Sequence, residues 1–178
     1  MHTSTKIHRV NSLLSAACLT LMFALPIVDL YFWFNFQQTA QLLNPSLVSQ
    51  LQMTTIRPWQ VISAAAFSLS STMIFVIGLN YLRQLFERFK SAEFFSQNTV
   101  FSLYMVAKLL LICAFIRCIS SAVLSVLLTW NNPPNERALV ISLGSNELWM
   151  MILAATFLTI AWSFKEGQRL AQENAEIV

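Results

Sequence analysis

Four long apolar stretches, separated by short polar connections, constrain this chain more than any other feature of its sequence. They lie at residues 13–36, 61–82, 101–130 and 147–164. Each is close to the ~20 residues that an α-helix needs to cross the ~30 Å hydrocarbon core of a bilayer. Only 11% of the residues are charged, against about 25% in soluble domains. The sequence therefore predicts an all-α membrane protein, a bundle of four transmembrane helices forming a single membrane domain over residues 1–178.

Lysine and arginine are distributed unequally between the two predicted sides of the membrane. One side carries Lys6, Arg9, Arg83, Arg88, Lys90, Lys165 and Arg169, and the other carries Arg57 and Arg137. Short connections rich in these residues stay in the cytoplasm. We therefore expect both termini, the connection 83–100 and the tail 165–178 to be cytoplasmic. The connections 37–60 and 131–146 are then external.

The first apolar stretch needs a separate argument, because basic residues precede it as they precede the core of a signal peptide. The stretch continues past Pro26 to Phe36 without a small-residue cleavage pattern. We interpret residues 13–36 as an uncleaved first transmembrane helix.

Three charges lie inside the apolar stretches, where charges are costly and usually face other helices. Counted from the inner boundary, Asp29 and Arg117 both come ~24–26 Å into helices that run in the same direction. We expect them at one level, as an ion pair that fixes helix register or as a ligand or proton site, with snorkelling to the outer surface as a third interpretation. Lys108 is nearer the inner boundary, where snorkelling to the cytoplasmic interface is expected. It lies on another helix face than Arg117, which disfavours a single cationic channel lining.

The chain lacks the residue patterns that catalysis and metal binding need. Its histidines, His2 and His8, are both in the N-terminal tail, so neither a membrane histidine base nor a haem or zinc site is expected. Cys18, Cys113 and Cys118 all fall in apolar stretches, which predicts buried free thiols and no disulfide framework. We expect a non-enzymatic protein without a metal or cofactor.

Two cytoplasmic segments carry a family resemblance. One is RQLFERFK at residues 83–90, followed by EFFSQN at 93–98, and the other is FKEGQRLAQEN at 164–174. With four spans and both ends inside, the chain resembles the bacterial membrane family known as domain of unknown function 2975. It departs from that family at Ala92, where glycine is usual, and in its last residues, which lack the usual aspartate. Members are often encoded beside a small helix-turn-helix transcription factor, so the resemblance implies a membrane partner of such a regulator.

These patterns lead to one main functional hypothesis and two alternatives. The candidate partner-binding surface consists of cytoplasmic basic, aromatic and amide side chains: Arg83, Arg88, Lys90, Phe94, Phe95, Asn98, Lys165 and Arg169. In the main hypothesis, a signal near Asp29, Arg117 and the external connections alters this surface. The surface binds the helix-turn-helix regulator, and the chain itself does not bind nucleic acid.

The first alternative is a small transporter or an accessory subunit of a membrane complex, in which Asp29 and Arg117 form part of a polar path. The second is a structural homo-oligomer without a ligand. For the basic residues of the connection 83–100 taken singly, attraction to the anionic lipid surface is equally consistent with the sequence.

Overall fold

The computed structural model describes residues 2–43, 56–91, 96–133, 135, 137, 139–141 and 144–176. In chain order the described elements are α1 (His2–Phe34), α2 (Phe36–Thr39), the 3-10 turn η1 (Ala40–Leu42), α4 (Pro58–Lys90), α5 (Gln97–Thr129) and α6 (Ser145–Glu176). Within this described part, four helices contain an apolar segment long enough to cross a membrane: His8–Phe34, Pro58–Lys90, Gln97–Thr129 and Ser145–Leu170. The predicted all-helical fold with four helices of membrane-spanning length is confirmed.

The long helices exceed the thickness of a bilayer core. α4 and α5 have 33 residues each, which is about 50 Å of helix against a hydrocarbon core of about 30 Å. α4 continues beyond the predicted span to Lys90, and α6 runs through the predicted polar tail to Glu176. Roughly 20 Å of each of these helices therefore extends beyond a bilayer core.

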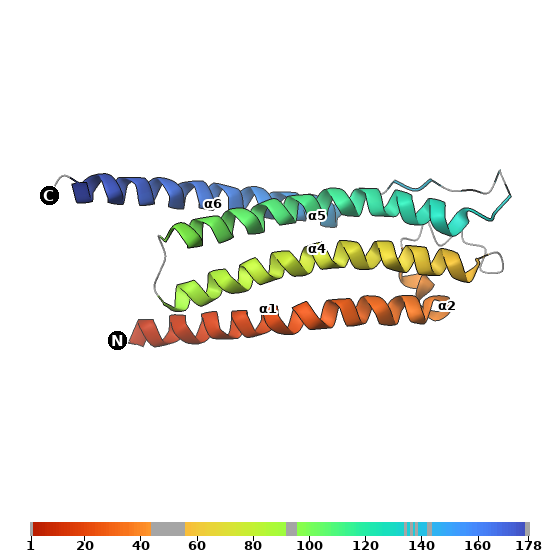
Figure 1. Ribbon diagram of the computed structural model, residues 1–178, viewed down its shortest axis with the longest axis horizontal. Coiled ribbons are helices and arrows are strands. Elements are labelled where there is room, and N and C mark those ends of the chain that lie inside the picture. The colour runs from red at the N-terminus through yellow and green to blue at the C-terminus, as the bar shows by residue number, and fades with distance from the viewer. Residues whose placement is uncertain are drawn as a thin grey trace.

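The four long helices lie antiparallel and side by side in chain order (Figure 1). The extensive contacts among the described helices join α1 to α4, α4 to α5 and α5 to α6. α1 and α6 are therefore the edges of a row, which is more open than the bundle that the sequence predicts. The N- and C-terminal ends of the chain lie at the same end of this row (Figure 1).

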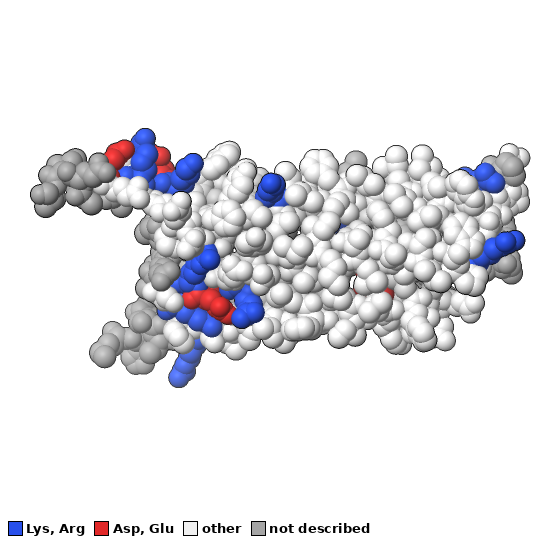
Figure 2. Space-filling view, viewed as in Figure 1, with Lys and Arg blue, Asp and Glu red and all other residues white. Residues whose placement is uncertain are grey.

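Each end of the row has its own group of charges. Figure 2 shows lysine, arginine and acidic residues gathered at the end that holds the termini, basic residues at the opposite end, and a broad uncharged surface with isolated charges between them. We call the first the basic end and the second, where α1 meets α2 and α5 meets the 131–144 segment, the loop end. The position of both termini at the same end of the row agrees with the lysine and arginine distribution. The side of the membrane that each end faces stays a prediction.

α1 shows how sequence spacing produces the row. Its buried residues Asn11, Ser15 and Cys18 recur three or four positions apart and share one face. Large apolar side chains such as Phe23 and Ile27 are exposed on the rest of the helix. An edge helix with an apolar outer surface is what a lipid environment accommodates.

Two apolar clusters hold the row together, one near each end. The loop-end cluster comprises Trp33, Phe36, Ala40, Ala64 and Leu128, and the basic-end cluster comprises Leu85, Leu103 and Ala161 with Phe157 and Phe164 packed against it. Beside the loop-end cluster, the fully buried Gln60 ties α4 to α5. Its Nε2 donates to the carbonyl of Leu127 at 2.7 Å, and its Oε1 accepts from the backbone of Arg57 at 2.8 Å and from Asn131 Nδ2 at 2.7 Å.

The chain after α5 turns back along that helix. The backbone N–H of Val140 donates to Ser125 Oγ at 2.9 Å, one turn inside the end of α5. Near the start of α6, Glu147 contacts Arg117, which precedes the end of α5 at Thr129 by twelve residues. α6 starts at Ser145, two residues before Glu147, and therefore begins about 15 Å short of the end of α5. It extends past the other helices at the basic end (Figure 1). The predicted external connection is thus partly a return segment packed on α5.

Candidate functional site

Asp29 lies on the face of α1 that contacts α4. Both of its carboxylate oxygens accept hydrogen bonds from α4: Oδ1 from Ser68 Oγ at 2.7 Å and Oδ2 from Thr72 Oγ1 at 2.9 Å. Ser68 and Thr72 are four residues apart, so a helix presents both hydroxyls to the same point. Nothing in the sequence spacing of Ser68 and Thr72 indicates that they bind Asp29.

Arg117 has a different partner. Its Nε donates to Glu147 Oε1 of α6 at 3.1 Å, and the second carboxylate oxygen accepts the backbone N–H of Gly144 at 2.9 Å. The Arg117 side chain is 57% exposed, whereas that of Glu147 is 10% exposed. Glu147 is in the first turn of α6, where the helix dipole favours negative charge.

The predicted Asp29–Arg117 ion pair is therefore wrong. The reason is the order of the helices: α1 packs on α4, and α5 packs on α4 with one side and on α6 with the other. Each of the two charges contacts a polar group on the adjacent helix, because an unpaired charge in an apolar layer is costly. Glu147 was assigned only to the boundary of the fourth span, although an acidic residue directly after Gly144-Ser145-Asn146 is a typical signal of a helix start.

Both polar contacts border one cavity. This cavity, of about 510 Å³, lies among α1, α4, α5 and α6 and is lined by Leu25, Ser71, Thr72, Phe75, Leu110, Cys113, Ile116, Arg117, Asn146, Trp149, Met150 and Leu153. Thr72, which binds Asp29, is on its α4 wall, and Arg117 is on its α5 wall. The structure thus brings the two predicted residues to one cavity without pairing them, and their role there stays a prediction.

At the basic end, several residues of the predicted partner surface link helices to one another. Glu87 accepts from Arg83 at 3.1 Å within α4 and from Ser15 of α1 at 3.1 Å. Arg88 donates to the backbone carbonyl of Asn98 and to Ser102 Oγ of α5. The guanidinium of Arg88 is thereby engaged in joining α4 to α5.

The remaining predicted surface residues fall into two groups. Lys90 is the last residue of α4, whereas Phe94 and Phe95 lie outside the described residues. Lys165 and Arg169 are on α6, at a groove of about 840 Å³ that α6 forms with α5. Because Asn98 is near the start of α5, the basic-end residues come from three helices.

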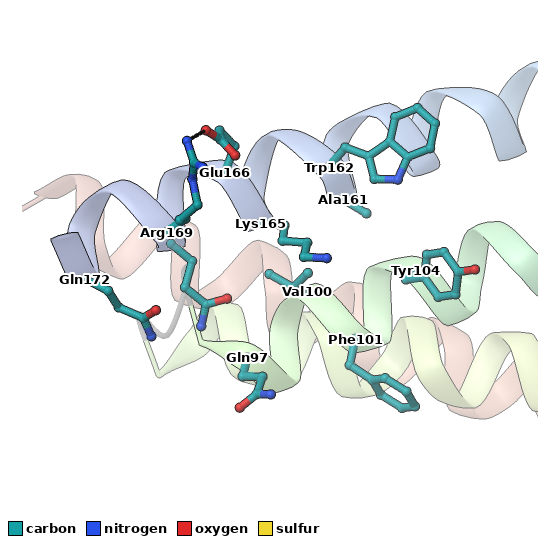
Figure 3. Close-up of a pocket in the computed structure, with 11 residues that line it drawn as sticks. Gln97, Val100, Phe101, Tyr104, Ala161, Trp162, Lys165, Glu166, Arg169 and Gln172 are labelled. Carbon is teal, nitrogen blue, oxygen red and sulfur yellow. Dashed lines mark hydrogen bonds and ion pairs between the residues drawn. The ribbon is translucent and has the colours of Figure 1, made fainter.

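The groove between α5 and α6 combines aromatic, amide and basic groups. It is lined by Gln97, Val100, Phe101, Tyr104, Ala161, Trp162, Lys165, Glu166, Gln168, Arg169 and Gln172. Figure 3 shows Lys165 reaching from α6 toward Val100 on α5, while Arg169 turns to Glu166. Arg169 pairs with Glu166 at 2.6 Å and with Glu173 at 3.7 Å. Within the described residues, Lys165 has no hydrogen bond or ion pair.

Lys108 lies deeper along the same two helices. It is exposed and borders a smaller pocket, of about 230 Å³, lined by Tyr104, Ala107, Leu111, Met151, Ala154, Ala155 and Leu158. Arg117 borders the separate 510 Å³ cavity. The two cations thus face different spaces, as their nine-residue spacing predicts.

The thiols and possible metal ligands show no assembled centre in the described chain. Cys18 and Cys113 are buried and Cys118 is half-buried, and all three are free. The buried free thiols predicted for Cys18 and Cys113 are confirmed. Among the described residues, no group of three or more histidine, cysteine, aspartate or glutamate side chains could hold a metal ion.

Four apolar helices of spanning length, with charges concentrated at the two ends of the row, define a multi-pass helical membrane protein. The particular family follows from a family model, described as protein of unknown function (DUF2975), which matches residues 36–178. The chain belongs to this family, as the segments 83–98 and 164–174 suggested. No curated protein and no solved structure matches the chain significantly.

Proposed function

We propose that this chain is a non-enzymatic regulatory protein of the bacterial inner membrane. Its basic end binds a soluble cytoplasmic helix-turn-helix regulator, and a ligand or membrane signal at the 510 Å³ cavity modulates that binding. The observation that carries the proposal is the projection of α6 beyond the other helices at the basic end (Figure 1).

The projecting part of α6 has the features of a helix in water. It follows the uncharged stretch 148–164, which at ~1.5 Å per residue covers ~26 Å and nearly crosses a bilayer core. Arg169 pairs with Glu166 and Glu173, three and four positions away, a spacing that stabilises exposed helices by about 0.2–0.5 kcal/mol per pair. A charged helix held outside the membrane is an accessible docking element for a soluble partner.

The same helix also connects the cavity with the docking element. α6 carries Glu147 and Trp149 at the cavity and Arg169 in the projection. A ligand that displaces Glu147 from Arg117 would shift α6 along or away from α5. Because a helix moves as a stiff rod, the docking element would move with it. The regulatory proposal therefore depends on the movement of α6, which couples the cavity to the docking element.

Site-specific crosslinking tests the partner. A photoreactive amino acid replaces Gln172, which is exposed on α6 and lines the basic-end groove. A matched control places it at Gln38, exposed on α2 at the loop end. In living host cells, position 172 should crosslink to a helix-turn-helix protein identified by mass spectrometry, and position 38 should not. Capture of the same protein at both positions, or of membrane proteins alone at position 172, contradicts the proposal.

A transporter is the second candidate, because the cavity is bordered by Arg117 and by Thr72, the partner of Asp29. Transport predicts that Asp29→Asn or Arg117→Gln abolishes ion or proton flux into vesicles containing the purified protein, while insertion is unchanged. The regulatory proposal predicts no flux in the unaltered protein and an altered crosslinking yield at position 172 in the Arg117→Gln variant.

A further inference from the structure

The basic-end groove and the pocket at Lys108 form one furrow between α5 and α6. Tyr104 lines both of them, so they meet at this residue. On α5 the furrow follows Gln97, Phe101, Tyr104, Lys108 and Leu111, which recur three or four positions apart and therefore share one face. Its polar lining is at the basic end, and its inner part is apolar apart from Lys108.

The inner part of the furrow has the length of an acyl chain in one leaflet. From Phe101 to Leu111 the helix rises about 15 Å, which is half of a ~30 Å hydrocarbon core. The opposite wall on α6 is formed by Met151, by the small residues Ala154 and Ala155, and by Leu158. Small side chains leave room for a chain lying along the helix.

The outer part of the furrow has the chemistry of an anionic headgroup site. Lys165 is exposed and reaches between the helices (Figure 3), while Arg169 is paired with Glu166 and Glu173. Trp162 is 61% exposed and Phe101 54% exposed at the same level. Exposed aromatic residues next to a lysine mark the level of the membrane interface. A basic pocket between transmembrane helices at that level suits a phospholipid phosphate.

The described contacts of α6 with its neighbours differ in chemistry along its length. Near its start an ion pair joins α6 to α5 through Arg117 and Glu147. At the basic end it contacts α4 and α5 through the apolar cluster of Leu85, Leu103 and Ala161. A lipid chain can lie beside such an apolar contact without breaking a polar one.

We propose that the α5–α6 furrow binds one anionic phospholipid. The Nζ of Lys165 and the amide of Gln97 bind the phosphate, and one acyl chain lies along Tyr104 to Leu111 against Ala155. This lipid site is independent of the proposed regulatory partner, since it needs only the bilayer in which the helices lie.

The full-length protein in phosphatidylcholine vesicles provides the test. Trace spin-labelled phosphatidylglycerol or phosphatidylcholine is added, and the motionally restricted fraction in the electron paramagnetic resonance spectrum gives their relative association constants. We expect phosphatidylglycerol to be preferred about 5-fold, the effect of one lysine near a membrane surface. Lys165→Gln should remove this preference and Lys165→Arg should keep it. Ala155→Phe, which fills the open furrow, should lower the restricted fraction of both lipids.

Two matched controls and one competitor make the outcome decisive. Lys90→Gln changes a lysine at the same end outside the furrow, and Ala16→Phe adds the same bulk on the exposed surface of α1. Neither should change the preference. Soluble glycerol phosphate should not compete, because it has no acyl chain. Equal binding of the two lipids, or an equal loss in Lys90→Gln and Lys165→Gln, overturns the proposal. Circular dichroism confirms that each variant retains its helices.

Discussion

Replacing either member of the Arg117–Glu147 pair tests how the row of helices is held together. Glu147 has a side chain only 10% exposed, whereas that of Arg117 is 57% exposed. In Arg117→Gln the nearly buried carboxylate of Glu147 loses its cation. It keeps the hydrogen bond from the Gly144 N–H at 2.9 Å and its position at the N-terminal end of α6. Glu147→Gln leaves a half-exposed guanidinium that can turn toward water. The two substitutions should therefore differ in their cost.

The magnitudes follow from the exposures. A hydrogen bond to a charged group contributes about 1.5–3 kcal/mol, and breaking a fully buried pair costs about 3–5 kcal/mol. The cost of breaking the Arg117–Glu147 pair is smaller than that of a fully buried pair, because solvent screens the half-exposed charge of Arg117. We expect Arg117→Gln to lower the free energy of unfolding by about 2–3 kcal/mol and Glu147→Gln by about 1 kcal/mol. The double variant should show a coupling of about 1 kcal/mol.

The assay is reversible unfolding of the purified protein in mixed detergent, followed by circular dichroism. A second double-variant cycle, Asp29→Asn with Arg117→Gln, is the control, because it tests the ion pair expected from the sequence. That cycle should show a coupling below about 0.5 kcal/mol, as for independent sites. Equal costs of the two single variants, or a larger coupling of Arg117 to Asp29 than to Glu147, would refute the reasoning.

Three further changes test the other interhelical contacts. Gln60→Leu removes the side-chain hydrogen bonds of Gln60 to the Leu127 carbonyl, the Arg57 N–H and Asn131. It should lower the free energy of unfolding by about 2–3 kcal/mol in the same detergent assay; an unchanged stability would contradict the contact. Thr72→Val keeps the shape of the side chain but removes one hydrogen bond to Asp29, so the free energy of unfolding should fall by about 1 kcal/mol. An unchanged free energy of unfolding would mean that Asp29 relies on other groups. Arg88→Leu separates α4 from Ser102 and should speed proteolysis at the basic end, whereas unchanged cleavage would argue that the apolar cluster alone holds these helices.

Hydropathy and charge were enough to predict the helices, because each span needs about 20 apolar residues whatever its neighbours are. The charge distribution also placed both termini at one end. The height of Asp29 and Arg117 followed from the helix rise: Arg117 lines the 510 Å³ cavity, and Asp29 binds Thr72 on the wall of the same cavity. The position of a residue along its helix axis follows from its spacing in the sequence. The predicted spans and the predicted level of Asp29 and Arg117 depended on this spacing alone.

The order of the helices is not encoded in that way. A stretch of leucine and phenylalanine packs on many neighbours, so the sequence did not indicate that α4 would stand between Asp29 and Arg117. The return of the chain after Trp130 was equally hidden, because it depends on the bond from Val140 to Ser125. That return brings Glu147 to the level of Arg117. The partner of Arg117 could therefore not be predicted without the path of the connection.

The polar contacts also indicate which helix is most able to move. α1 is joined to α4 near both ends, through Ser15 with Glu87 and through Asp29 with Thr72. α4 is joined to α5 near both ends, through Arg88 and Gln60. α6 is joined to α5 by an ion pair near its start and by apolar packing at the basic end. In a bilayer no hydrophobic driving force holds apolar helix surfaces together, so such a contact depends on van der Waals packing. A signal at the cavity and a lipid in the furrow would therefore both act on the position of α6, the helix that projects toward the proposed partner.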